Sequence, residues 1–187
     1  RHREKVVLAA AFAPNADTND VLQLTEPLED FLGPIDSETA FGYANFWKAS
    51  QDGILRAASF SRTPNEANHH DAHEDEFRFD SLMAASARQL GYQVPDKDKL
   101  FRLGRIEGES LQQVYAPKSL YTVFVPHDWK HSYNDGIYFK DKIIIIGAAA
   151  PILHDSHETS AGTIYGAQVH LHVLSAILDD KWYQQIA

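Results

Sequence analysis

The sequence contains no cysteine among its 187 residues. This absence excludes a disulfide scaffold, a thiol nucleophile, and a zinc or iron–sulfur site held by cysteine. It leaves the cellular compartment open, because chains without cysteine occur in reducing and oxidising compartments alike.

Long hydrophobic runs are also missing. The most apolar stretches, Val6 to Ala13 and Ile143 to Ala150, are far shorter than the ~20 residues that a membrane-spanning helix needs. The opening RHREK leads at once into VVLAAAFA and has none of the apolar character of a signal peptide. We therefore interpret the chain as a fragment of a longer protein, with no membrane span of its own.

Basic residues are outnumbered: 17 lysines and arginines face 26 acidic residues, for a formal net charge of -9. Phosphate backbones attract basic surfaces, so we expect no nucleic-acid partner. The sequence also lacks a P-loop, a G-x-G-x-x-G fingerprint and a G-x-S-x-G elbow. These absences argue against the common nucleotide-binding folds and against a serine hydrolase.

What is present suits one domain with a real core, since 44% of the residues are hydrophobic. Val6 to Ala13 is continuously apolar and predicts a strand covered on both faces. Val21 to Leu32 contains Pro27 and predicts broken helical turns at best. Ala40 to Trp47 and Ile54 to Ser61 flank an Asp-Gly pair, which favours a β-hairpin.

The rest of the chain continues the alternation of elements. Thr63 to Glu76 has no apolar periodicity and predicts a solvated loop. Apolar residues from Phe79 to Leu90 recur at helical spacing, and Gly91 follows as a C-terminal cap. Leu120 to Val125 and Ile143 to Ile146 predict strands, the latter buried. The fold class is therefore α/β, a central mainly parallel or mixed sheet with flanking helices and an inserted β-hairpin.

Polar chemistry is concentrated between Asp141 and Leu178. There the predicted Ile143 strand leads into Gly147, a loop rich in His and Asp, a second glycine and an amphipathic helix bearing His170. This order places polar groups at the carboxyl end of a central strand, where open α/β sheets bind ligands. The His170 ring is expected to face the sheet, either as a satisfied core histidine or with Asp155 as the polar floor of a ligand site.

Two histidine-rich segments raise the question of a metal. His154, Asp155 and His157 are ligand types that a divalent ion uses, although HDSHE is not a zincin motif and loop histidines are commonly just solvated. The denser run from His69 to Glu76 is interpreted as a charged, solvated loop. We expect no cofactor, with a divalent metal at the first set as the alternative.

The segment FGYANFWKASQDGILRAASF resembles a signature of the type-two CHASE domain, the extracellular sensory domain of bacterial membrane receptors. The matching positions are Gly42, Asn45, Asp52, Gly53 and Arg56. Only one of the two usual acids is present. The same residues also have a structural interpretation, because Asp-Gly suffices for a turn and an arginine pairs readily with a nearby carboxylate.

Two later segments, FKDKIIIIGAA and YGAQVHLHVLSAIL, resemble the closing elements of the same family. The residues that carry this likeness are Gly147, Ala148, Asp155, Thr159, Gly166, Val169 and His170. The chain differs from the family pattern at Tyr165, Gln168 and Leu171, where proline, glutamate and alanine are typical.

The resemblance implies that residues 1–187 form a single extracytoplasmic sensor domain, with the amino-terminal segment of the family pattern absent. It implies a periplasmic or extracellular location on a bacterial inner-membrane protein, a small-molecule ligand, and a homodimeric, membrane-anchored parent receptor. The output would be a cyclase, a histidine kinase, a serine/threonine kinase or a diguanylate cyclase, so no catalytic residue is expected here. The residues expected to bind the ligand are Gly147, Ala148, Asp155, Thr159, Gly166 and His170.

Two alternatives to a sensor domain remain open. A metal-dependent hydrolase would use His154, Asp155 and His157, and a soluble solute-binding protein would lack membrane segments in its parent chain. Metal content separates the first from a sensor, and the flanks of the parent gene separate the second.

Overall fold

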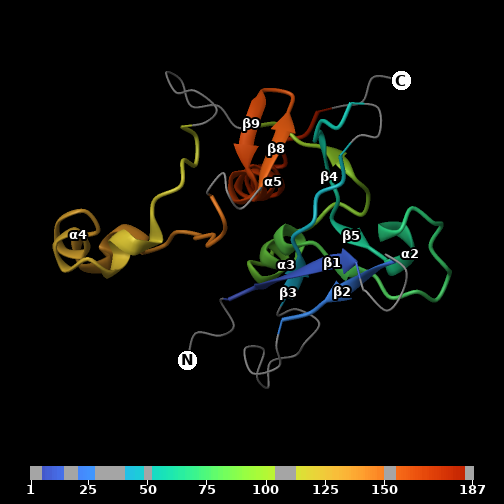
Figure 1. Ribbon diagram of the computed structural model, residues 1–187, viewed down its shortest axis with the longest axis horizontal. Helices are drawn as coiled ribbons and strands as arrows, with labels where there is room; N and C mark the ends of the chain where they lie inside the picture. The colour runs from blue at the N-terminus through green and yellow to red at the C-terminus, as the bar shows by residue number, and fades with distance from the viewer. Residues whose placement is uncertain are drawn as a thin grey trace. The chain divides into compact units, whose positions relative to one another are not determined.

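The computed structural model describes residues 6–14, 21–27, 41–48, 52–103, 113–149 and 155–183. The chain divides into two compact units, Arg1–Leu103 with His172–Ala187, and Gly104–Leu171. Small sheets alternate with helices along the chain, which confirms the predicted α/β class (Figure 1). That residues 1–187 act as one sensor domain, lacking an amino-terminal segment, stays a prediction.

The first unit is built on a three-stranded mixed sheet. Strand β1 (Leu8–Pro14) runs antiparallel to β2 (Leu22–Thr25) and parallel to β3 (Phe41–Tyr43), and it lies between them (Figure 1). The mixed sheet agrees with the prediction, but the prediction that this strand is covered on both faces is wrong. Ala10 and Phe12 are buried whereas the alternate residues are exposed or half-buried, so this strand is covered on one side.

The prediction of helical turns over Val21 to Leu32 is wrong for the residues that the structure describes. Leu22 and Leu24 are half-buried and Gln23 between them is exposed, which is the two-residue period of a strand. Pro27 lies beyond the end of β2, where it removes no ladder hydrogen bond.

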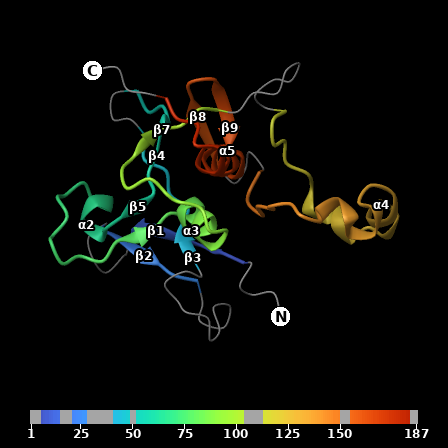
Figure 2. The ribbon, with the colours of Figure 1, turned by 180° about the vertical axis from the view of Figure 1, so that it is seen from behind.

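The predicted hairpin between Ala40 and Ser61 is also wrong. After β3 the chain forms β4 (Ala57–Ala58) and β5 (Ser61–Arg62), and neither pairs with β3. Instead, β4 pairs with β7 (Lys99–Leu100), and β5 pairs with β6 (Phe79–Asp80), both antiparallel. Figure 2 shows β4 beside β7. The strands β4 and β5 therefore pair with segments distant in sequence, and not with the strand before the Asp-Gly turn.

The predicted loop from Thr63 to Glu76 contains a short helix, α2 (Pro64–Ala67). Thr63 accepts a hydrogen bond from the Glu66 N–H, and the Glu66 carboxylate accepts one from the Thr63 N–H, a capping box with proline in the first turn. Ala67 is fully buried. The remainder of the segment, from His69 to Asp75, is exposed as predicted.

The predicted helix after Phe79 is confirmed as α3 (Leu82–Gln89), which is shorter because Phe79 belongs to a strand. Ser81 caps its first turn by accepting a hydrogen bond from Ala84. Gly91 ends it with a φ of 81°, the left-handed conformation expected of a C-terminal glycine.

Aromatic side chains fill the core beside the mixed sheet. Phe12, Tyr43 and Ala67 are buried together, with Trp47 and Phe79 packed against them. The ring centroids of Phe12 and Tyr43 are 5.5 Å apart, and those of Tyr43 and Trp47 are 5.2 Å apart in an edge-to-face arrangement. Burial raises the pKa of the Tyr43 phenol well above its usual value, so this ring stays neutral.

In the second unit, the predicted strand Leu120 to Val125 is wrong, because Leu120–Phe124 forms a 3₁₀ helix, η3. The helix α4 (Pro126–His131) follows, and then a second 3₁₀ segment, η4 (Asn134–Phe139). Both the backbone N–H and the hydroxyl of Thr122 donate to the Ser119 carbonyl. These short-range bonds satisfy groups that a strand would have offered to a neighbour.

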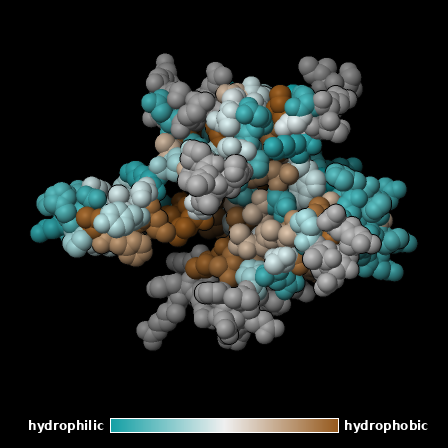
Figure 3. All heavy atoms as spheres, viewed as in Figure 1, coloured by the Kyte–Doolittle hydropathy of each residue, from teal (hydrophilic) through white to brown (hydrophobic). Residues whose placement is uncertain are grey.

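The predicted buried strand Ile143 to Ile146 is wrong as well. No strand is formed over these residues, and the exposed fractions of Ile143, Ile144 and Ile146 are 43%, 54% and 73%. Figure 3 shows apolar residues as brown spheres on one face of the molecule. Gly147 and Ala148 of the predicted ligand site therefore do not follow a sheet strand.

The closing part of the chain contains a β-hairpin. Strands β8 (Ser156–Thr159) and β9 (Gly162–Tyr165) pair antiparallel and lead directly into α5 (Gly166–Asp179) (Figure 2). Among the described helices, α5 included, none combines the length and apolar character that crossing a bilayer requires.

Candidate functional site

The structure brings Asp155 and Gly166 together at the start of α5. The Gly166 N–H donates a hydrogen bond of 2.9 Å to the Asp155 carbonyl. The Asp155 carboxylate lies so close to the glycine that a β-carbon there would be 2.7 Å from Oδ2. On its other side, Asp155 Oδ1 is 3.3 Å from His157 Nε2. Any side chain at position 166 would therefore force this carboxylate to move.

Gly147 also lies beside the first turn of α5. A β-carbon on Gly147 would be 3.3 Å from that of Ala167, a tight but tolerable contact. Gly147 is exposed and Ala148 half-buried. Two of the predicted glycines thus lie at the start of one helix, although the strand expected before Gly147 is absent.

Thr159 is separated from these residues in the turn of the β8–β9 hairpin. Its hydroxyl donates a 2.6 Å hydrogen bond to the Gly162 carbonyl and accepts one of 3.3 Å from the Ala161 N–H. The side chain is buried. These contacts give Thr159 a structural role in the turn, and its ligand role stays a prediction.

His170 lies on the buried side of α5, as its spacing with Val173 and Leu174 predicted. His172 is buried too, with no exposed surface, so apolar and imidazole side chains are covered around most of the helix. Burial lowers the pKa of His172 to about 4, which keeps its ring neutral at physiological pH.

Gln168 stands where the family pattern has glutamate, and the structure explains how the amide is used. Its side-chain oxygen accepts a 3.2 Å hydrogen bond from the Tyr165 N–H, and its Nε2 donates one of 3.1 Å to the Val114 carbonyl. An ionised glutamate could accept from Tyr165 but could not donate to Val114. Gln168 therefore fixes the start of α5 and a distant stretch of chain together.

The metal-ligand candidates come together only in part. Asp155 and His157 are in contact, while His154 lies outside the described residues. Within the described parts of the chain, no group of three or more histidine or acidic side chains could hold a metal ion. In the exposed run after His69, Glu76 accepts hydrogen bonds from the backbone of Asn65 and His73, which ties it to the fold.

Among the signature residues, Gly42 and Asn45 hold the mixed sheet to its surroundings. A β-carbon on Gly42 would lie 2.6 Å from the Ser81 carbonyl carbon, so β3 reaches the start of α3 only through glycine. The Asn45 amide accepts from the Phe12 N–H at 2.7 Å and donates to the Phe12 carbonyl at 2.9 Å. It thereby extends the hydrogen bonding of β1 beyond the end of β3.

The other signature residues form a small exposed turn. Asp52 accepts from the Ile54 N–H at 3.0 Å, Gly53 has a φ of 68°, and Arg56 Nη1 donates to Asp52 at 2.8 Å. The Arg56 hydrogen bond lowers the pKa of Asp52 to about 2. This geometry supports the structural interpretation of these three residues.

The comparisons with known proteins bear on the whole arrangement. A family model described as the CHASE2 domain matches residues 2–186, nearly the whole chain. The chain belongs to the CHASE2 family. CHASE2 domains are extracellular sensory domains of receptors, which confirms the predicted family and places the chain among sensory modules. No curated protein and no solved structure matches it.

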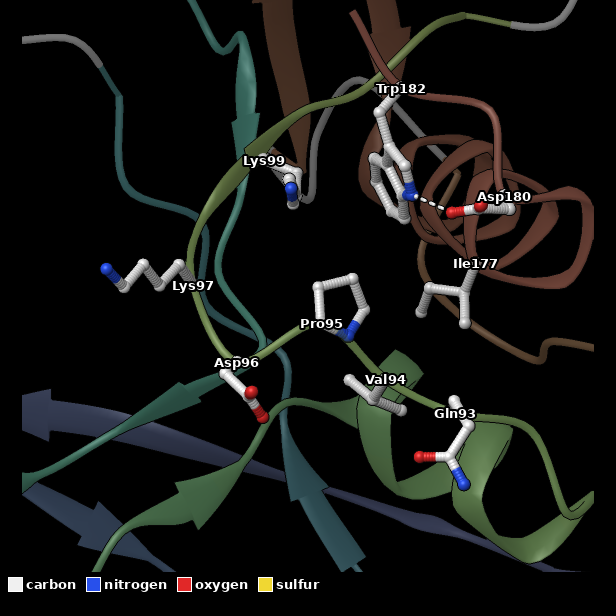
Figure 4. A pocket seen from close by; sticks show the side chains of 9 residues that line it. All are labelled: Gln93, Val94, Pro95, Asp96, Lys97, Lys99, Ile177, Asp180 and Trp182. Atoms are coloured by element: carbon white, nitrogen blue, oxygen red, sulfur yellow. Dashed lines mark hydrogen bonds between the residues drawn. The ribbon is translucent and has the colours of Figure 1, made fainter. Parts of the chain in front are cut away.

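This CHASE2 domain also has a pocket that no sequence motif indicated. It has a volume of about 440 Å³ and lies in the first unit, between residues 93–99 and the end of α5 (Figure 4). The residues that line it are Gln93, Val94, Pro95, Asp96, Lys97, Lys99, Ile177, Asp180 and Trp182.

Proposed function

We propose that the chain is the ligand-binding, extracytoplasmic sensory domain of a bacterial transmembrane signalling receptor. The observation that carries this proposal is the CHASE2 match over residues 2–186. The domain would face the periplasm or the exterior, be anchored by its parent chain to the inner membrane, and act as a homodimer. The output would be a cyclase, a histidine kinase, a serine/threonine kinase or a diguanylate cyclase.

The build of α5 supports a role in passing on a signal. Its start is fixed by Asp155 and Gln168, and its side chains are buried or half-buried from Gly166 to Leu178. A ligand produces a signal only if it favours one of two arrangements of the domain. A packed helix with a well-defined start is an element that can shift as a unit between such arrangements.

We assign the domain no catalytic step of its own. The hydrolase alternative needs His154, Asp155 and His157, but the Asp155 carboxylate already lies against Gly166 and contacts His157. Contacts within the fold therefore explain the position of the Asp155 carboxylate without a metal ion. The expected partners are a small molecule and a second receptor subunit, while the net charge of -9 argues against nucleic acid.

The test uses the full-length parent receptor in intact cells and in spheroplasts. Membrane-impermeant labelling of a cysteine introduced at exposed Glu74 should report an extracytoplasmic location. Small-molecule mixtures added outside should change the output activity, and replacing residues 2–186 with an inert linker should abolish that response. A cytoplasmic label, or a response that survives the replacement, would overturn the proposal.

A further inference from the structure

The pocket of the first unit has one wall made by a short segment, residues 93–99, which we call the strap. The strap is held at its end by the pairing of β7 with β4. It is also held by an ion pair of 2.8 Å between Asp98 and Arg62, whose guanidinium lies 4.9 Å from the centre of the Trp47 ring. These contacts connect the strap to the aromatic core, so this wall of the pocket is preformed.

The opposite wall is made by the end of α5 and by Trp182. The indole Nε1–H donates a 2.9 Å hydrogen bond to Asp180, and the ring meets Phe60 edge to face with centroids 5.5 Å apart. Backbone pairing of Trp182 with Phe101 fixes the chain at this point. The ring is thus held in one orientation before any ligand arrives.

Both apolar and charged side chains line the pocket. In Figure 4, Trp182, Pro95 and Ile177 surround a common space, with Lys99 on the same side as the indole and Lys97 extending away. In the part of the chain that the structure describes, Lys99 is paired with no carboxylate. Asp180 is engaged by the indole. Lys99 is the basic group on the indole side of this space, while the Asp96 carboxylate also lines the pocket.

We propose that this pocket binds a small planar carboxylate, with an aromatic or heteroaromatic ring against Trp182 and Pro95 and its carboxylate on Lys99. The volume of about 440 Å³ falls within the range of roughly 300 to 1,000 Å³ common for small-molecule sites. Flat rings pack well on an indole, and an ammonium forms stronger hydrogen bonds with a carboxylate than with an uncharged acceptor. This inference rests on the proposed sensory function and gives it a site and a ligand class.

The position of the pocket connects binding to the last turns of α5. Ile177 and Asp180 lie on and just after that helix, while Pro95 and Lys99 belong to the strap. A ligand between them would favour arrangements in which the strap and the helix end are close. The site differs from the loop around Asp155, to which the sequence had pointed.

The experiment follows the indole N–H resonances of the ¹⁵N-labelled chain by NMR. The three tryptophans give three signals, and Trp182→Phe identifies the one in the pocket. Indole-3-acetate is the probe, and indole-3-acetamide is its uncharged match. We expect a saturable shift of the Trp182 signal with the acid, at least about tenfold weaker binding of the amide, and no shift of the Trp129 signal.

Two lysine variants form a matched pair. Lys99→Met should weaken binding of the acid by about tenfold or more, whereas Lys130→Met, at an exposed residue that does not line the pocket, should leave it unchanged. Absence of a saturable shift, equal binding of acid and amide, or equal effects of the two variants would overturn the proposal. Such a result leaves the sensory function standing, because the receptor response and its dependence on residues 2–186 are measured separately.

Discussion

At the scale of single residues, side-chain amides make backbone contacts that sequence motifs do not reveal. Asn45 pairs with both backbone groups of Phe12, and Asn68 pairs in the same way with Leu22, at 2.7 and 2.9 Å. Each amide supplies a donor and an acceptor at once, as a neighbouring strand would. This explains why an asparagine, and not merely a polar residue, matches the signature at position 45.

Replacing Asn45 with alanine should lower the free energy of unfolding by about 2 kcal/mol, since two hydrogen bonds to a part-buried backbone are lost. Asn45→Asp keeps the acceptor for the Phe12 N–H but faces the Phe12 carbonyl with a second acceptor. It should therefore also be destabilising. Urea unfolding followed by circular dichroism measures both, and Asn68→Ala should behave like Asn45→Ala. An Asn45→Asp variant as stable as the native chain would contradict this role.

At the scale of elements, the sequence predicted best where the signal is local. The helix α3 has its apolar period, its Ser81 cap and its Gly91 end within a dozen residues, and it was predicted. The helix α2 was not predicted, although the capping box formed by Thr63 and Glu66 can be recognised in the sequence. For β2, Pro27 favours a break in the chain whereas the alternation of Leu22 and Leu24 indicates a strand, and the structure follows the alternation.

Strand pairing was predicted poorly because its partners are distant in sequence. The Ile143 to Ile146 run has high strand propensity, yet none of the described segments pairs with it, and propensity does not supply a partner. The candidate site shows the same division. The contact of Asp155 with Gly166 joins two residues that the sequence analysis names as ligand-binding candidates. The pocket instead brings together the strap and Trp182, which are some eighty residues apart, and no sequence motif marks it.

The close contact at the start of α5 leads to a prediction for that element. Gly166→Ala should cost about 2 kcal/mol, because its new methyl group would overlap the Asp155 carboxylate. In a chain that already carries Asp155→Ala, the same substitution should cost almost nothing, since alanine is favourable in a helix. A double-mutant cycle by urea unfolding gives the coupling energy between the two positions.

Gly91→Ala provides the control for this cycle. Gly91 has a positive φ, and a β-carbon added there would meet no atom within 4 Å, so its cost of about 1 kcal/mol comes from the backbone alone. That cost should be the same with and without Asp155→Ala. If the Gly166→Ala cost is equally insensitive to residue 155, the close contact does not determine the glycine requirement.

At the scale of the whole molecule, His172 makes folding depend on pH. Its pKa is about 4 in the folded chain against 6.5 for an ordinary histidine, so between these values the unfolded chain binds more protons than the folded one. Stability is then greatest above pH 6.5 and falls as the pH drops towards 4. Between about pH 7 and pH 5 the loss should be about 2 kcal/mol.

Urea unfolding at closely spaced pH values over that range measures this loss. The Asp52 carboxyl, with a pKa of about 2, titrates well below the range and does not interfere. His172→Gln should be less stable at neutral pH, because it alters a fully buried position, but its stability should fall less steeply between pH 7 and pH 5. The difference between the two slopes isolates His172 from the other nine histidines. Parallel curves for the two proteins would show that the pH dependence arises elsewhere.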